Sequence, residues 1–362
     1  MSAGPRGVLI MAGGTGGHIF PGLAVADTLM GKGVSVRWLG ARGGMECQKV
    51  PEAGIPLDVV DISGLRGKGL ARWIVMPWKL LRAVIQAFRL LGAHRPACAV
   101  SFGGYAAGPG GLAARLRGVP LLVHEQNRIP GMTNRVLSRM ARRVLQAFPG
   151  TWEERLDPVS CGNPVRKAVV DLASPTIRMA GREGAVRVLV TGGSQGARAL
   201  NLLVPQALSM VSSDLPFEVR HQAGKGRAAE TEEAYGAPPY RVEISEFIED
   251  MAAAFQWADI VICRSGALTV SELAAAGIAS ILVPFPYAVD DHQTRNAEFL
   301  VETGAAVLMQ ESVTDARSLS DVLTDLMGDR KKLLEMAEKA RAVSVPDSAE
   351  RVARLCMEYQ AA

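Results

Sequence analysis

A pattern that occurs twice constrains this chain more than any other feature: a short apolar run, a pair of glycines, then an amphipathic segment. The first run covers residues 8–12 and ends at Gly13-Gly14, and the second covers 186–191 and ends at Gly192-Gly193. The first run is continuously apolar, which indicates a strand that is buried on both faces, as in parallel sheets, and the second run is also predicted to be a strand. Each pattern therefore predicts the first strand, loop and helix of a separate α/β domain.

The rest of the sequence supports two doubly wound, Rossmann-like parallel-sheet domains. Further strands are predicted at residues 34–40, 97–102, 121–124, 143–147, 217–221, 240–244, 260–263, 280–283 and 305–308. Helical periodicity predicts helices at 18–29, 197–210 and 348–359. We expect one domain over residues 1–165 and another over 166–344, with 345–362 able to pack back on the first. A length of 362 residues suits this division.

Charge is divided unevenly along the chain. The net charge is +4, yet residues 62–152 hold fourteen basic side chains and a single acid, Glu125. Such a basic surface suits phosphate, nucleic acid or anionic lipid. Five scattered cysteines without a metal-binding spacing indicate a reducing, cytoplasmic compartment. Neither a signal peptide nor a bilayer-spanning run is expected.

The first glycine loop, residues 13–18, lies where backbone N–H groups can approach a phosphate at the start of a helix. The dinucleotide spacing GxGxxG fails because Ile19 stands at the third glycine position, and the phosphate-loop pattern GxxxxGK[ST] does not occur. His18 follows the glycines at the expected helix start. A capping or packing role explains it as well as a catalytic one.

Three loops of the second half could also bind a ligand. Residues 192–198 repeat the glycine pattern, although a plain strand–helix turn explains them equally well. In 263–272, Ser265-Gly266 stands at a helix start, and Glu272 could accept hydrogen bonds from two vicinal hydroxyls or serve as a capping acid. Residues 284–296 are rich in hydrogen-bonding side chains, and ligands of open α/β sheets bind at such strand ends.

Two further clusters follow predicted strands of the first half. One is Ser101-Phe102-Gly103-Gly104-Tyr105, and the other is His124-Glu125-Gln126-Asn127. An isolated carboxylate amid so much positive charge stays ionised. Glu125 is therefore either a charge-balancing group or a functional one.

Six stretches, in order over both halves, resemble the MurG family of bacterial N-acetylglucosaminyltransferases. They are GGTGGHIFPGLAVA from Gly13, SFGGYAAGPG from Ser101, HEQNRIPGMTNR from His124, GNPVR from Gly162, GGSQGARALN from Gly192 and RSGALTVSELAAAG from Arg264. The resemblance implies the two-domain GT-B architecture with an interdomain cleft. It also implies inverting transfer of GlcNAc from UDP-GlcNAc to the MurNAc 4-hydroxyl of lipid I, undecaprenyl-pyrophosphoryl-MurNAc-pentapeptide, which forms lipid II in peptidoglycan synthesis.

The resemblance further implies roles for single residues. His18 and Glu125 are alternative general bases, with His18 slightly favoured, and Gly103, Gly104, Tyr105 and His124 lie on the acceptor side. Ile248, after Phe247, would meet the uracil, the amides from Ala267 to Thr269 the pyrophosphate, and Glu272 the ribose. Either His292 or Gln293 would read the GlcNAc hydroxyls. The full set of implied UDP-GlcNAc contacts is Thr15, Gly16, Gly17, Asn127, Arg166, Ser194, Ile248, Ala267, Leu268, Thr269, Val270, Ser271, Glu272, His292 and Gln293.

The charge of the leaving pyrophosphate needs a partner. The sequence has no D-x-D motif for a metal, so helix-terminal amides and arginine are expected to stabilise it. We therefore predict no obligatory metal and no other cofactor.

Residues 64–92 suggest contact with an anionic membrane. Apolar residues at helical spacings alternate there with basic ones, and part of the stripe must be core. The residues are Trp73, Ile74, Trp78, Leu81, Ile85 and Phe88, with Arg72, Lys79, Arg82 and Arg89. Pro77 is expected to mark a helix start or break. Together with the resemblance, this predicts a peripheral protein on the cytoplasmic face of the cell membrane, with cell-wall synthesis proteins as possible partners.

Four other functions compete with this interpretation. A glycolipid synthase could use another acceptor, such as diacylglycerol, although the HEQN and SFGGY stretches argue against it. A UDP-sugar epimerase could share the scaffold. The failed GxGxxG opposes an NAD(P)-dependent oxidoreductase, and the lack of a recognition motif opposes a nucleic-acid binder.

Overall fold

The computed structural model describes residues 6–62, 71–193 and 196–360, with the backbone alone for 71–75. These residues form two compact units. The first runs up to Arg166 and resumes at Val345, and the second covers Lys167–Ser344. The last helix, α15 (Ser348–Met357), thus belongs to the first unit.

A seven-stranded parallel sheet forms the centre of the first unit, in the order β3-β2-β1-β4-β5-β6-β7. The three central strands are largely apolar, and their side chains are buried on both faces. Their bounds are β1 (Val8–Ala12), β2 (Val36–Ala41), β3 (Leu57–Val60), β4 (Cys98–Gly103), β5 (Leu121–Glu125), β6 (Arg143–Gln146) and β7 (Val159–Ser160).

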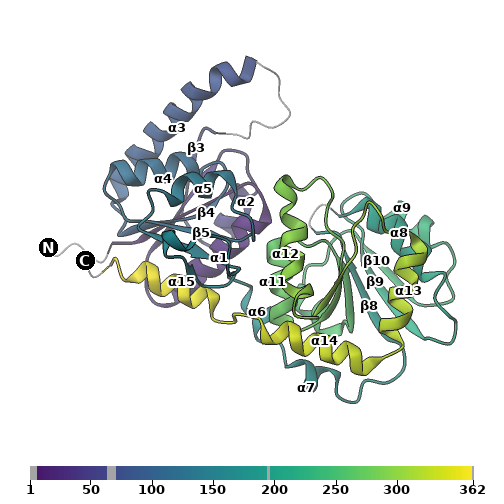
Figure 1. Ribbon diagram of the computed structural model, residues 1–362. Coiled ribbons are helices and arrows are strands. Elements are labelled where there is room, and N and C mark those ends of the chain that lie inside the picture. The colour runs from purple at the N-terminus through teal and green to yellow at the C-terminus, as the bar shows by residue number, and fades with distance from the viewer. Residues whose placement is uncertain (1–5, 63–70, 194–195, 361–362) are drawn as a thin grey trace. The chain divides into compact units, whose positions relative to one another are not determined.

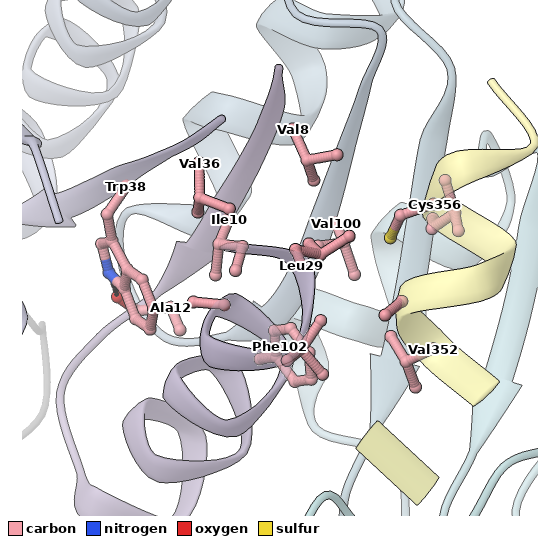
Figure 2. Packing of buried hydrophobic residues seen from close by; sticks show 14 of the residues in the cluster. Val8, Ile10, Ala12, Leu29, Val36, Trp38, Val100, Phe102, Val352 and Cys356 are labelled. Carbon is pink, nitrogen blue, oxygen red and sulfur yellow. Dashed lines mark hydrogen bonds between the residues drawn. The ribbon is translucent and has the colours of Figure 1, made fainter. Parts of the chain in front are cut away.

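Helices cover both faces of this sheet (Figure 1). One face carries α1 (Gly16–Gly31), α2 (Glu46–Glu52) and α15, and the other carries α3 (Ala71–His94), α4 (Ala107–Leu116) and α5 (Met132–Ser138). Figure 2 shows how Val352 and Cys356 of α15 join the core made by Val100 and Phe102 of β4. Burial of these apolar side chains fixes the C-terminal helix to the first unit.

A six-stranded parallel sheet forms the second unit, in the order β10-β9-β8-β11-β12-β13. The strands are β8 (Val186–Thr191), β9 (Phe217–Gln222), β10 (Val242–Ser245), β11 (Ile260–Cys263), β12 (Ala279–Leu282) and β13 (Ala306–Leu308). The helices are α6 (Lys167–Val170), α7 (Pro175–Met179), α8 (Arg198–Leu208), α9 (Ala228–Tyr235), α10 (Met251–Trp257), α11 (Ala267–Ala276), α12 (His292–Val301), α13 (Ala316–Met327) and α14 (Arg330–Ala342). Its core joins α8, α13 and α14 to the sheet.

The two sheets confirm the predicted α/β class with two Rossmann-like domains. The expectation for Pro77 was wrong, because α3 continues through this residue. Proline removes one N–H···O=C bond from a helix, and burial of the α3 face that holds Ala83, Ala87 and Leu91 offsets that loss. Two strands were not predicted: β3, a half-buried edge strand, and β7, which has two residues.

Candidate functional site

The strand order of the first sheet reverses between β1 and β4, which are neighbours although two strands follow β1 before β4 along the chain. Ligands of open α/β sheets bind at such a point, beside the carboxyl ends of the strands. The pairing of β1 with β4 shifts register between Met11 and Ala12, so that Ala12 lies opposite Gly103. The two glycine loops of the first unit thus begin side by side.

Close packing of these loops requires their glycines. A Cβ on Gly104 would lie 2.2 Å from the carbonyl oxygen of Gly13, and one on Gly103 would lie 3.2 Å from His18 Nε2. Both glycines have φ near +90° or above, at +101° for Gly103 and +89° for Gly104, which side chains disfavour. Tyr105 is exposed and its ring lies near Gly14. The structure therefore brings the predicted residues Gly103, Gly104 and Tyr105 to the His18 loop.

His18 lies in the first turn of α1, after the N-cap residue Thr15. Its Nδ1 is 3.3 Å from the carbonyl oxygen of Gly13 and 3.4 Å from Thr15 Oγ1. A carbonyl oxygen only accepts hydrogen bonds, so a hydrogen bond at this contact requires the proton on Nδ1. Nε2 then carries the lone pair, which is the form that a general base requires.

Glu125, the alternative base, is 1% exposed and ends β5. Its Oε1 accepts from the backbone N–H and the Nδ2 of Asn127, at 3.0 and 3.1 Å. Its Oε2 accepts from the N–H of Gly131 and the Nδ2 of Asn134, at 3.1 and 3.0 Å. Four donors on a buried carboxylate hold the 125–131 loop in place, which favours a structural role.

His124 is fully buried, and both ring nitrogens have partners. Its Nε2 donates to the carbonyl oxygen of Gly162 at 2.9 Å, and its Nδ1 accepts from Gln126 Nε2 at 3.1 Å. Burial lowers the pKa of His124 to about 4, so the ring is neutral near pH 7. This predicted acceptor-side residue lies inside the unit rather than on its surface.

Two more predicted residues of the first unit are Asn127 and Arg166, and they lie in different surroundings. Asn127 is half-buried beside Glu125, and its side-chain N–H group is turned toward that acid. Arg166 belongs to the first unit, one residue beyond the expected domain boundary, and its guanidinium carbon lies 5.7 Å from the ring centre of Phe20 on α1.

In the second unit the strand order reverses between β8 and β11. The loop after β8 packs closely on its neighbour, since a Cβ on Gly196 would lie 2.1 Å from the carbonyl oxygen of Ala223. Ser194, predicted in this loop, lies outside the described residues. The loop after β11 leads through Ser265 and the N-cap Gly266 into α11.

The loop after β12 is attached to the start of α11. Ser265 Oγ donates to the carbonyl oxygen of Gln293 at 2.8 Å, and the N–H of Phe285 donates to Gln293 Oε1 at 2.9 Å. This contact orients the Gln293 amide so that its NH₂ group is the remaining donor. His292 Nδ1 donates to the carbonyl oxygen of Val289 at 2.8 Å. Gln293 and His292 thus lie together beside the α11 N-terminus.

The predicted residues of α11 are Ala267, Leu268, Thr269, Val270, Ser271 and Glu272. The first turn offers the N–H groups and the positive dipole end that favour an anion. Val270 is buried in the unit, and Ser271 Oγ donates to the carbonyl oxygen of Ala267 at 2.9 Å. Glu272 is 4% exposed.

Phe247 and Ile248 follow β10, an edge strand, and Phe247 is exposed. Because β10 and β11 are separated by β9 and β8, these residues lie about three strand spacings, ~14 Å, from the α11 strand end. A ligand that reaches both places must be elongated, as a nucleoside diphosphate is.

Sequence reasoning missed two buried residues of the first site. Glu46 is 0% exposed and accepts hydrogen bonds from the N–H groups of Gly14 and Ala41. Asn134 accepts from Ser101 Oγ at 3.0 Å and donates to Glu125. Glu46 follows the glycine pair Gly43-Gly44, and Asn134 lies in the stretch from His124 that carries the family resemblance, so these positions were the available signals.

The structure describes the side chains of residues 6–62, 76–193 and 196–360, and the backbone alone of 71–75. Within these ranges no group of three or more His, Cys, Asp or Glu side chains could hold a metal ion. No helix among them is both long and apolar enough to cross a bilayer.

Comparisons with known proteins cover nearly the whole chain. Residues 8–146 match the N-terminal domain of glycosyltransferase family 28, and residues 187–352 match its C-terminal domain. A relative from Xanthomonas campestris pv. campestris is 54% identical over 99% of this chain and 83% of its own length, and one from Xylella fastidiosa is 53% identical over 98% and 96%. Both are named UDP-N-acetylglucosamine–N-acetylmuramyl-(pentapeptide) pyrophosphoryl-undecaprenol N-acetylglucosamine transferase.

A solved structure, MurG of Acinetobacter baumannii, has a TM-score of 0.85 and 40% identity, and the match covers 98% of this chain and 100% of that one.

Proposed function

The chain belongs to glycosyltransferase family 28, and on that premise we propose that it transfers N-acetylglucosamine from UDP-GlcNAc to the MurNAc sugar of lipid I, which yields lipid II. The observation that best supports this proposal is the identity of 53–54%, over nearly the full length of this chain, to relatives named for this reaction. The MurG structure agrees with it over 98% of the chain.

The second unit is proposed to hold the donor. The α11 N-terminus would take the pyrophosphate, and buried Glu272 on the same helix would accept hydrogen bonds from the ribose hydroxyls. Ile248 would meet the uracil at the far end of this elongated site. Gln293, whose NH₂ group remains a donor, fits the GlcNAc hydroxyls better than His292 because Ser265 fixes it beside the pyrophosphate site.

His18 of the first unit is proposed as the general base. Its Nε2 would take the proton of the MurNAc 4-hydroxyl while that oxygen bonds to the anomeric carbon and the bond from this carbon to UDP breaks. The electron pair leaves on the β-phosphate oxygen, where helix amides and arginine would stabilise it. We propose that a step of this kind inverts the configuration at the anomeric carbon and needs no metal.

Helix α3 supports contact with a membrane. Trp78, Leu81 and Ile85 are exposed on it, with Trp78 at 73%, whereas Ala83 and Ala87 are buried in the core. The helix is thus apolar both on the face that packs in the core and on the exposed face, and an exposed apolar face favours an apolar partner. Exposed basic residues of the same helix, Lys79, Arg82 and Arg89, suit anionic lipid. Trp73, Ile74 and Arg72 lie where side chains are not described.

We therefore propose a peripheral enzyme on the cytoplasmic face of the membrane, where its lipid-linked acceptor would be. Neutralising Lys79, Arg82 and Arg89 together should reduce co-sedimentation with phosphatidylglycerol vesicles. The control neutralises three exposed basic residues of the second unit: Lys225, Arg317 and Lys331. Equal binding of both variants would contradict a membrane role for α3.

A transfer assay with three acceptor conditions tests the reaction. Labelled UDP-GlcNAc is supplied with a short-chain lipid I analogue, with diacylglycerol, or with no acceptor. We expect a labelled disaccharide in the first condition alone. Label on diacylglycerol would indicate another glycolipid synthase, and release of UDP and free sugar without an acceptor would indicate an epimerase.

A further inference from the structure

Glu46 lies beneath the first glycine loop, although no pattern in the sequence connects it with that loop. It is the first residue of α2 and is completely buried. Its Oε1 accepts from the N–H of Ala41 at 2.9 Å, and its Oε2 accepts from the N–H of Gly14 at 3.1 Å. One carboxylate thus connects the chain that leaves β2 to the chain that leaves β1.

Three glycines make room for this carboxylate. A Cβ on Gly13 would lie 2.2 Å from Glu46 Oε1, one on Gly44 would lie 2.2 Å from Oε2, and one on Gly40 would lie 2.6 Å from Cγ. None of the three has a φ in the left-handed region, so backbone conformation does not require glycine there. The surroundings of Glu46 are therefore shaped around a carboxylate in this place.

The Gly13–Gly14 peptide lies between Glu46 and His18. Its N–H group, from Gly14, donates to Glu46 Oε2, and its carbonyl oxygen, from Gly13, lies 3.3 Å from His18 Nδ1. N–H and C=O point in opposite directions in a trans peptide, so the unit connects the two side chains. A carboxylate on the N–H polarises the peptide and makes its carbonyl oxygen a stronger acceptor.

We propose that Glu46 is a positioning residue for catalysis, which acts through the Gly13–Gly14 peptide to hold His18 with its proton on Nδ1 and its lone pair on Nε2. The inference rests on the proposed function, because it assigns Glu46 to the general base of that reaction. When Nε2 takes the proton of the acceptor hydroxyl, the positive charge of the ring is shared with Nδ1–H. The polarised carbonyl of Gly13 then stabilises that charge.

The ring tautomer of His18 in the unmodified chain is the first test. The chain has five histidines, so loss of one signal in His18→Ala identifies the His18 ring in a ¹⁵N spectrum. We expect Nδ1 to carry the proton when the His18 ring is neutral. A proton on Nε2 would overturn the proposal. This readout requires neither substrate nor activity, so it stands even if the chain makes no lipid II.

Glu46→Gln tests the effect on catalysis. Glutamine has the same shape, but its NH₂ group would face a backbone N–H donor, from either Ala41 or Gly14. We expect kcat to fall about 10²-fold, within the contribution of a positioned general base, while the KM for UDP-GlcNAc stays within about twofold. The acidic limb of the kcat–pH profile should move to lower pH, and the His18 proton should partly shift to Nε2. The control is Glu52→Gln, an exposed acid of the same helix.

Gly44→Ala provides an independent perturbation, because it keeps the acid and displaces its carboxylate. It should reproduce the kcat loss and the tautomer shift, and the double variant should be no worse than Glu46→Gln alone. Fluorescence of Trp38 and Trp152, which are buried in the first unit, reports that this unit is folded in each variant. If Glu46→Gln does not fold, Gly44→Ala and the tautomer in the unmodified chain decide. Unchanged kcat, pH profile and tautomer in folded variants would overturn the proposal.

Discussion

Replacing Glu125 by glutamine distinguishes a structural acid from a general base. The carboxylate is almost completely buried and accepts four hydrogen bonds, two on each oxygen. Glutamine keeps one accepting oxygen and turns an NH₂ group toward the two donors of the other. Two hydrogen bonds to a charged group are lost, at about 1.5–3 kcal/mol each, so the first unit should lose roughly 3–6 kcal/mol of its free energy of unfolding.

Urea unfolding of the full chain, followed by tryptophan fluorescence, measures this loss. The control is Glu154→Gln, which removes an exposed acid from the same unit and should change stability by less than about 0.5 kcal/mol. Under conditions where Glu125→Gln is folded, it should retain most of its kcat. A variant as stable as the unmodified chain whose kcat falls by 10² or more would refute this reasoning and identify Glu125 as the base.

Three further predictions concern single residues. Glu272→Ala should raise the KM for UDP-GlcNAc by about 10²-fold, since a buried acid that accepts from hydroxyls is lost, and unchanged donor affinity by calorimetry would exclude the ribose contact. Burial lowers the pKa of His124 to about 4, so between pH 6.5 and 4 the unfolded chain binds more protons than the folded chain. The free energy of unfolding therefore decreases as the pH is lowered through this range. Between pH 7 and 5 the unmodified chain should lose about 2 kcal/mol more than His124→Gln, by urea unfolding at both pH values. Gly104→Ala should reduce kcat sharply through its clash with Gly13, whereas Gly118→Ala, with a similar φ but open space, should not.

The strands were predictable where burial leaves a continuous apolar run. The bounds of β8 and β11 agree with the predicted strands 186–191 and 260–263 to the residue. The edge strand β3 was not predicted, because Asp58 interrupts its apolar pattern and its side chains are half exposed. The prediction of a helix start or break at Pro77 was wrong for a similar reason, since local propensity cannot report the tertiary burial that keeps α3 intact.

The loops of the candidate site could be predicted from the sequence, whereas the buried contacts that hold these loops in place could not. The first glycine loop identified the strand end at which His18 lies, and the hydrogen-bonding side chains of residues 284–296 identified the strand end at which Gln293 lies. The sequence could not indicate that His124 and Glu125 are buried with their polar atoms engaged by neighbours, because their hydrogen-bond partners lie up to 38 positions away. Glu46 was missed for the same reason, since its partner Gly14 lies 32 residues earlier.

Transfer of labelled GlcNAc to a short-chain lipid I analogue in the presence of EDTA tests the central claim most directly. We expect a disaccharide whose new bond is β, formed at an undiminished rate, since helix amides and arginine are proposed to stabilise the departing UDP. Absence of any disaccharide, although the chain binds UDP-GlcNAc, would contradict the proposed reaction. A disaccharide that forms only without EDTA would keep the reaction and overturn the proposal that it needs no metal.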